Sequence, residues 1–261
     1  MPPLAMLAIL SLNAGPNVEI VAHRGASWDA PENTVAALKL AWEQRADASE
    51  FDVYLSRDGE VVVIHDKDTK RTAGVERLVA EQTLEELRKL DAGRWKGEKF
   101  AGERVPTLAE MLAAVPAGKR VFVEVKCGVE VVPALAKRLK ASKLKPDQTP
   151  VISFDADVIA AVKKALPDVP AYWLVSLKPK NGKVPTAKSL VERARKLGAD
   201  GLDLSATEAL DSAYAKQIKD AGLKLYVYTV NDADVARRMV EIGVDGITTD
   251  RPAWLRDQLS K

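Results

Sequence analysis

The sequence predicts an α/β fold, a TIM (β/α)8 barrel with a small insertion after the second strand, and three observations support this prediction. From Val18 onward, short apolar runs alternate with amphipathic helical patterns along the chain of 261 residues. Eight such strand–helix units fit in about 250 residues, which is the usual length of this barrel. A doubly wound open sheet is the alternative, but no glycine-rich G-x-G-x-x-G turn follows the first apolar run.

The expected strands are rich in Val, Ile, Leu and Tyr, as is typical of parallel strands that are buried on both faces. They are Val18–His23, Ser49–Leu55, Arg120–Lys126, Thr149–Phe154, Ala171–Ser176, Gly201–Ser205, Lys224–Val230 and Gly246–Asp250. The expected helices are Thr34–Gln44, Val129–Ala141, Asp157–Leu166, Ala187–Leu197, Ser212–Ala221, Asp234–Ile242 and Pro252–Leu259. Gly198, Gly222 and Gly243 each follow a helical run, where a left-handed residue is favoured.

The repeat is interrupted after the second expected strand. Asp58-Gly59 separates two β-rich runs, which is a strong signal for a hairpin. We therefore expect Glu60–His65 to run antiparallel to the second strand, outside the barrel itself. The following segment, about residues 66–106, is too long for an ordinary βα loop of about 2–6 residues. It contains a helical pattern of its own, Thr83–Leu90, and such an insertion usually builds or covers the active site.

The composition is that of an ordinary globular protein and excludes several function classes. Hydrophobic residues make up 47% and charged residues 29% of the chain, a balance that argues against disorder. The 39 basic and 37 acidic side chains leave a net charge of +2, and no basic block is interleaved with aromatic residues, so nucleic acid is not an expected partner. The single cysteine, Cys127, excludes an intrachain disulfide and a zinc site built from several cysteines.

Residues 1–17 form a separate apolar segment ahead of the expected barrel, which covers residues 18–261. The run Pro3–Ala14 is apolar and ends in a small residue, as in a signal peptide, but no Lys or Arg precedes it. It is too short to span a bilayer, so no stable membrane insertion is expected. Two interpretations stay open, an export-signal remnant and an apolar plug on the barrel. The choice between an exported or periplasmic and a cytoplasmic location depends on them, and the oligomeric state stays open as well.

Carboxylates cluster near the ends of neighbouring early strands. Glu50 and Asp52 are two residues apart in the second strand and so share one face, and Glu124 lies in the third strand of the barrel. A buried carboxylate needs a compensating charge. Ion pairs with Arg24 and Lys126 are one solution, and a bound cation is the other. Because all three acids are expected at the functional face of a barrel, they favour a cation, and an all-oxygen site suits Mg²⁺ or Ca²⁺.

The only two histidines of the chain are predicted to converge on these acids. His23 ends the first strand. The hairpin turn at Asp58-Gly59 places positions near Ile64 and His65 opposite positions near Asp52 and Glu50, and cross-strand neighbours lie about 5 Å apart, so we expect His65 beside the carboxylates. A lone histidine is usually structural, but two histidines in one predicted cleft indicate acid–base catalysis.

The same residues carry a resemblance to the glycerophosphodiester phosphodiesterase family. In order and spacing, the segments that are similar to its stronger motifs are His23-Arg24-Gly25, Ala30–Thr34, Glu50-x-Asp52-Val53, Asp58-Gly59, Val62–Asp66 and Glu124-x-Lys126. Weaker similarity covers Arg71-Thr72, Val105–Leu108, Ser153-Phe154, Thr229–Asn231 and Gly243–Pro252, so the resemblance extends over nearly all of the chain after residue 18. The family often has Trp where this chain has Tyr228, which bears on the shape of the substrate pocket.

The resemblance implies that the chain hydrolyses glycerophosphodiesters to glycerol 3-phosphate and an alcohol. It implies that Glu50, Asp52 and Glu124 hold a divalent cation, Mg²⁺ or Ca²⁺. Together with that cation, Arg24 and Lys126 would bind the phosphate oxygens and stabilise the charge that develops on them.

It further implies that His23 and His65 act as general acid and general base, with the substrate's own hydroxyl attacking through a cyclic phosphate. Which histidine is the acid is left open by the sequence. Glu32 is interpreted as part of a helix start with Asn33 or Thr34 as N-cap, and it is left out of the metal site.

Two other functions are compatible with the sequence. One is a related phosphodiesterase acting on another phospholipid or polymer head group, for which Trp95 and Phe100 are the only apolar candidates at a membrane-facing rim. The other is a barrel that binds phosphate without catalysis, but it would be expected to lack one of the histidines or carboxylates. Trp28, Trp173 and Tyr228 either line the alcohol pocket or belong to the core.

Overall fold

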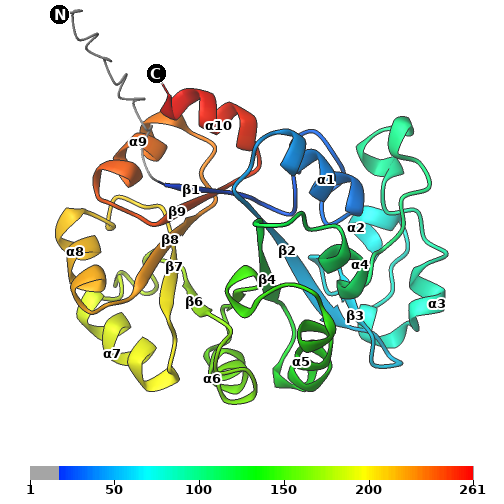
Figure 1. Cartoon of the computed structure of the whole chain (residues 1–261), viewed down its shortest axis with the longest axis horizontal. Coiled ribbons are helices and arrows are strands. Elements are labelled where there is room, and N and C mark those ends of the chain that lie inside the picture. The colour runs from blue at the N-terminus through cyan, green and yellow to red at the C-terminus, as the bar shows by residue number, and fades with distance from the viewer. Residues whose placement is uncertain (1–17, 261) are drawn as a thin grey trace, which may run out of the picture.

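The computed structural model describes residues 18–260 and confirms the barrel with its small insertion. Eight parallel strands form a closed sheet in the order β1-β9-β8-β7-β6-β5-β4-β2, and the β1–β2 pairing closes it. Helices surround the strands, as Figure 1 shows. The β3 strand pairs antiparallel with β2 and stays outside the closed barrel, as the hairpin signal predicted.

All eight expected strands are present, with ends that differ from the expected ones by at most two residues. Together with the hairpin strand β3 (Val61–Val63), the strands are β1 (Glu19–Ala22), β2 (Ala48–Leu55), β4 (Arg120–Val125), β5 (Val151–Ser153), β6 (Ala171–Val175), β7 (Gly201–Ser205), β8 (Lys224–Tyr228) and β9 (Gly246–Thr249).

The longer helices also lie where the sequence predicted them. They are α1 (Val35–Glu43), α5 (Val132–Ala141), α6 (Ala156–Ala165), α7 (Ala187–Leu197), α8 (Ser212–Asp220), α9 (Ala233–Glu241) and α10 (Pro252–Leu259). Thr34 is the N-cap of α1, since its side chain accepts a hydrogen bond from the backbone of Ala37. An additional helix, α4 (Leu108–Ala113), precedes β4 and begins with a capping box between Thr107 and Glu110.

The insertion between β3 and α4 is built from short turns of helix around a small core of its own. Its elements are α2 (Lys70–Ala73), η1 (Val79–Glu81), α3 (Leu84–Leu87), η2 (Arg94–Lys96) and η3 (Glu98–Phe100). The expected helix Thr83–Leu90 is therefore too long. Its last residues form tighter turns, with the backbone N–H of Leu90 bonded to Leu87, and Asp91 then accepts hydrogen bonds from three backbone N–H groups, those of Gly93, Arg94 and Gly102.

Residues alternate between the two faces of the strands, and this alternation decides what the barrel encloses. One face of each strand joins the large core beneath the helices. The other face points into the barrel, where Phe122, Tyr172 and Tyr226 are in mutual aromatic contact. Arg120 donates a hydrogen bond to Glu19, 2.7 Å away, at the N-terminal end of the strands. The aromatic side chains and the Arg120–Glu19 pair fill the N-terminal half of the barrel interior, so polar side chains further along the strands face its C-terminal mouth.

The apolar segment at the start of the chain lies outside the described residues. Among residues 18–260, no helix has both the length and the hydrophobicity needed to cross a bilayer.

Candidate active site

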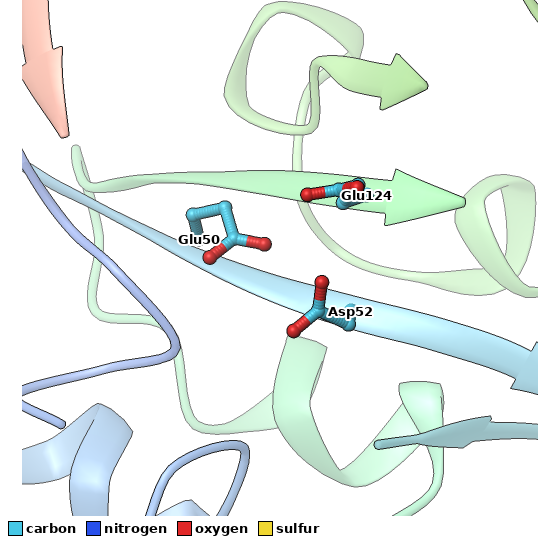
Figure 2. Close-up of side chains that lie close together, drawn as sticks. All are labelled: Glu50, Asp52 and Glu124. Carbon is cyan, nitrogen blue, oxygen red and sulfur yellow. The ribbon is translucent and has the colours of Figure 1, made fainter. Parts of the chain in front are cut away.

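Glu50, Asp52 and Glu124 form an acidic cluster at the C-terminal half of the barrel interior. Asp52 and Glu124 are register partners in the parallel pair β2–β4, and Glu50 lies two residues earlier on the same face of β2. One oxygen from each carboxylate lies within 4.8 Å of the other two. Figure 2 shows the three groups pointing toward one another from the two strands.

Both predicted cations lie beside the acidic cluster. Lys126 Nζ is 2.7 Å from Glu124 Oε1 and 3.5 Å from Asp52 Oδ1. Arg24 Nε is 3.2 Å from Asp52 Oδ2. Asn33 fixes the same carboxylate, because its Nδ2 donates to Asp52 Oδ2 at 2.8 Å and its Oδ1 accepts from the Asp52 backbone N–H at 3.0 Å.

The turn after β1 brings Arg24 into this position. Arg24 and Gly25 both have positive φ, 55° and 81°, and the backbone N–H of Arg24 donates to Glu50 Oε2 at 2.9 Å. A Cβ at Gly25 would lie only 2.5 Å from the carbonyl carbon of Ala37, so glycine is required where this turn meets α1. The His-Arg-Gly sequence therefore contributes the backbone conformation of this turn as well as its side chains.

The two cations do not satisfy the acidic cluster completely. Oε1 of Glu50 and Oδ1 of Asp52 are buried and have no hydrogen-bond partner among the described residues. Burial, together with repulsion from Asp52 and Glu124, raises the pKa of Glu50 well above its ordinary value. Burial and Asp52 also raise the pKa of Glu124. A buried, all-oxygen group with two unpartnered oxygens fits a hard divalent cation.

His23 is held by a carboxylate from the last strand. Its Nδ1 lies 2.6 Å from Asp250 Oδ1, which also accepts from Ser27 Oγ at 3.0 Å. Burial acts to raise the pKa of Asp250, but hydrogen bonds from His23, Asn231 and Ser27 lower it to about 2. The ionised carboxylate can only accept, so Nδ1 of His23 carries the hydrogen and Nε2 is left for chemistry.

His65 is held in the same way from the other side. Its Nδ1 lies 2.6 Å from Asp66 Oδ1, and Arg71 Nε donates to the other oxygen of Asp66 at 2.7 Å. Hydrogen bonds from Arg71 lower the pKa of Asp66 to about 2. Arg71 also binds Glu32 through both terminal nitrogens, and Glu32 in turn accepts from Arg24. Glu32 therefore links Arg24 to Arg71 and lies outside the acidic cluster.

The pKa of His65 favours its neutral form. Burial lowers the pKa of this imidazole below 6.5, and the positive charges of Arg24 and Lys126 add to the effect, against the opposite influence of Asp52 and Asp66. A neutral imidazole whose Nδ1 carries the hydrogen has a free lone pair on Nε2, as a general base requires.

A cavity of about 270 Å³ opens beside His23, and the exposed rings of Trp28 and Trp95 line it together with Lys96 from the insertion. Lys96 Nζ donates to the carbonyl of Ser27 at 2.7 Å and so ties the insertion to the turn after β1. Of the other aromatic candidates, Tyr228 reaches the barrel interior. Trp173 lies on the helix-facing side of β6, where Arg193 stacks over its ring.

Three functional partners were not identified from the sequence, namely Asp66, Asp250 and Asn33. Asp66 directly follows His65, so its adjacency was a usable signal. Asp250 directly follows β9, which pairs with β1 in the closed barrel, so closure itself predicts its approach to His23. Asn33 has φ of 60°, and no local pattern indicates that its side chain turns back to Asp52.

Comparison with known proteins identifies the family of the chain. The model of the glycerophosphoryl diester phosphodiesterase family matches residues 23–254. The chain is 39% identical to a glycerophosphodiester phosphodiesterase of Caldanaerobacter subterraneus subsp. tengcongensis over 93% of this chain and 98% of that protein. It is 31% identical to one from Bacillus subtilis, over 89% and 83% of the two chains.

Solved structures show the same relationship. A phosphodiesterase of Oleispira antarctica in complex with the product sn-glycerol-3-phosphate superposes with a TM-score of 0.84 at 31% identity, over 93% of this chain and 97% of that one. A glycerophosphodiester phosphodiesterase of Agrobacterium tumefaciens gives a TM-score of 0.76 at 30% identity, over 92% and 99%. The chain described here is therefore an enzyme of the glycerophosphoryl diester phosphodiesterase family.

Proposed function

We propose that this enzyme hydrolyses glycerophosphodiesters to glycerol 3-phosphate and an alcohol in a reaction that depends on a divalent cation. The observation that carries the proposal is the placement of two histidine–aspartate pairs around one buried acidic cluster with unpartnered oxygens. The product named in the Oleispira antarctica complex, sn-glycerol-3-phosphate, is the product expected here.

In this proposal Glu50, Asp52 and Glu124 hold the cation, and their all-oxygen character suits Mg²⁺ or Ca²⁺. When bound, the cation supplies Lewis-acid stabilisation of charge on the phosphoryl oxygens. Arg24 and Lys126 flank the acidic cluster and provide hydrogen-bond donors for the same oxygens.

The two histidines transfer the protons. We assign the general base to His65, because its lowered pKa keeps Nε2 unprotonated near neutral pH. His65 takes the proton from the attacking hydroxyl, which is the neighbouring hydroxyl of the substrate's glycerol when a cyclic phosphate forms, or a water molecule when the diester is hydrolysed directly. His23 then gives its Nε2 proton to the leaving alkoxide, and Asp250 stabilises the protonated imidazole that precedes this transfer. On the cyclic route a water molecule then opens the cyclic phosphate to glycerol 3-phosphate, with Nε2 of His23 taking the proton of the water and His65 returning its proton to the glycerol oxygen.

The test is hydrolysis of glycerophosphocholine by the purified protein with EDTA and after addition of Mg²⁺ or Ca²⁺. We expect activity to vanish with the chelator and to return with the metal. Full activity of the metal-stripped protein would sink the assignment of the acidic cluster. Binding of glycerol 3-phosphate without any turnover of diesters would instead support a non-catalytic, phosphate-binding barrel.

A related activity on another head group is the second candidate, and the cavity beside His23 favours it. The wall of this cavity combines the exposed Trp28 and Trp95 with Lys96, whose positive charge disfavours the choline cation. A panel of glycerophosphodiesters with choline, ethanolamine, glycerol and inositol alcohols, and of lysophospholipids, separates the two candidates by kcat/KM.

A further inference from the structure

Asp203, in the middle of β7, is a buried acid that the proposed mechanism does not use. It is 2% exposed, and its Oδ1 has no hydrogen-bond partner among the described residues. Its register partners Leu174 and Tyr226 belong to the interior layer of the barrel, whereas its chain neighbours Leu202 and Leu204 belong to the outer core. The carboxyl of Asp203 therefore points into the barrel.

Tyr228, at the end of β8, offers a second unpartnered group on the same wall. Its hydroxyl is buried and has no partner within residues 18–260. Its ring meets that of Phe154 edge to face, with centroids 5.7 Å apart, and Phe154 is 49% exposed. The pair therefore extends from the exposed ring of Phe154 to the buried hydroxyl of Tyr228. A buried polar atom without a partner costs about 1–3 kcal/mol, so two of them on one wall call for a ligand.

This wall lies across the barrel from the acidic cluster. In the closed strand order, β7 is opposite β2 and β8 is opposite β4, the two strands that carry the cluster. Lys126 connects the two sides, because its Nζ is 2.7 Å from Glu124 Oε1 and 5.9 Å from the centroid of the Phe154 ring. Glu124 also acts electrostatically on both Asp203 and Tyr228, so the wall and the acidic cluster face the same interior space.

The charges around this wall select the chemistry of the ligand. Burial and the charge of Glu124 raise the pKa of Asp203 well above its ordinary value, which favours a neutral partner over an ion at this carboxyl, and Lys126 at the entrance disfavours a cation. A neutral hydroxyl can donate to the carboxyl oxygen of Asp203 and exchange a hydrogen bond with the hydroxyl of Tyr228. A three-carbon polyol attached to the phosphate carries such neutral hydroxyls.

We propose that Asp203 and Tyr228 form a subsite that binds the glycerol hydroxyls of the substrate and so determines specificity for a glycerol ester over other phosphates. The inference rests on the proposed function and deepens it, since it names the side chains that recognise the part common to all glycerophosphodiesters. The alcohol on the other side of the phosphate is left to the cavity beside His23.

The experiment measures binding rather than turnover. The Mg²⁺-loaded wild type is titrated calorimetrically with sn-glycerol 3-phosphate and with inorganic phosphate. The Kd of phosphate divided by the Kd of glycerol 3-phosphate reports the contribution of the glycerol to binding. In Asp203→Leu we expect this ratio to fall on the order of 10-fold, with the phosphate Kd unchanged. In Tyr228→Phe, which keeps the ring against Phe154, we expect a fall of about 3- to 10-fold.

Asp203→Asn is the matched control, because an amide has the shape of the carboxyl and still both donates and accepts hydrogen bonds. We expect it to stay within about 3-fold of the wild-type ratio, since only the hydrogen-bonding pattern is needed. A loss in Asp203→Asn as large as that in Asp203→Leu overturns the hydroxyl subsite, because it shows that a negative charge is required.

The remaining outcomes are equally decisive. An unchanged ratio in both Asp203→Leu and Tyr228→Phe overturns the inference while leaving the proposed function in place. If KM for glycerophosphocholine rises in these variants with no change in the Kd of glycerol 3-phosphate, the wall binds the alcohol and the glycerol assignment is wrong. A wild type that binds neither phosphate nor glycerol 3-phosphate contradicts the proposed function itself.

Discussion

Replacing Glu50 by Gln should shift the stability of the metal-free and metal-loaded protein in opposite directions. Glu50 is 2% exposed, and its ligand oxygen lies within 4.8 Å of those of Asp52 and Glu124. Gln keeps the volume of Glu50 and can still accept from the backbone N–H of Arg24, 2.9 Å from Oε2. It removes the charge, however, which relieves repulsion in the metal-free protein and weakens the metal site.

The magnitude follows from the separation of the charges. Two unit charges 4.8 Å apart interact by about 3–4 kcal/mol at an effective dielectric constant of about 20. Attraction between Glu50 and Arg24 offsets part of the repulsion, so we expect Glu50→Gln to stabilise the metal-free protein by about 1–3 kcal/mol at high pH. For a chain of this size, that corresponds to a rise of roughly 2–10 °C in Tm.

Linkage fixes the pH at which this gain is seen. Because the pKa of Glu50 is raised in the folded state, the folded protein retains a proton that the unfolded chain releases above its ordinary pKa of 4.5. The stability of the metal-free wild type therefore falls as the pH rises from 4.5 through the raised pKa. The variant lacks this titration, so the difference between the two proteins is largest above that window.

The assay is thermal unfolding followed by circular dichroism, at pH 5 and pH 8, in EDTA and in excess Mg²⁺ or Ca²⁺. Metal at 100 times its Kd should stabilise the wild type by about 2.7 kcal/mol. The variant should unfold at the higher temperature in EDTA at pH 8, and the wild type should gain far more from the metal.

Glu19→Gln is the matched control, because Glu19 is an acid at the opposite end of the same barrel with its charge fully paired. Its Oε2 accepts from Arg120 and from the hydroxyl of Tyr226, each at 2.7 Å. This variant should be less stable than the wild type in every buffer and should keep the wild-type response to metal. If Glu50→Gln lowers the Tm in EDTA at pH 8, or gains as much from metal as the wild type, the reasoning is refuted.

The remaining predictions concern proton transfer and are checked by steady-state kinetics on glycerophosphocholine. His23→Ala and His65→Ala should each lower kcat by roughly 10²–10⁴-fold, and the double variant should lose much less than the product of the two losses. Only His65→Ala should also be slow on a p-nitrophenyl diester, whose leaving group needs no acid, so equal losses in both variants would contradict the assigned roles. Asp250→Asn should lower kcat by up to about 10⁴-fold with little change in the Kd of glycerol 3-phosphate, since it removes the negative charge and its amide can donate to Nδ1 of His23, which favours the wrong tautomer; near-wild-type kcat would show that this hydrogen bond is only structural. The acid limb of kcat/KM should lie below pH 6.5, because the folded-state pKa of His65 is lowered and the imidazole stays neutral down to that lower pH; a limb above 6.5 would argue against His65 as the base.

Local features of the sequence determined most of the fold and the positions of the reacting groups. The alternation of apolar runs and amphipathic patterns specifies the strands, because a parallel strand buried on both faces must be apolar along its length. The period of two along a strand places Glu50 and Asp52 on one face, and the Asp58-Gly59 turn pairs β3 antiparallel with β2. These inferences need only chain geometry over short distances, and β2, β3 and β4 agree with them.

The limits of local geometry are visible in α3 and Trp173. The capping box at Thr83 starts the helix where expected, but after Leu87 the backbone N–H groups of Lys89 and Leu90 bond to residues only three positions earlier. Asp91 then fixes the following turns by accepting from backbone N–H groups up to eleven residues away. For Trp173, the alternation of side chains along the strand does not decide whether the ring points into the barrel or toward the helices. Only the register with Ser153 and Leu202 decided that the ring faces the helices.

The aspartate partners of the two histidines also differ in whether local sequence or the tertiary fold brings them together. Asp66 is adjacent to His65 in sequence, whereas Asp250 is 227 residues from His23 and meets it only because β9 pairs with β1 to close the barrel. That Asp203 and Tyr228 have buried polar atoms with no partner within residues 18–260 is likewise a property of the closed barrel, since a residue's own sequence neighbours cannot specify what lies across the interior. The sequence by itself determined which chemical groups reach the mouth of the barrel. The tertiary structure decided which of them are paired, because pairing depends on distances between strands that are remote along the chain.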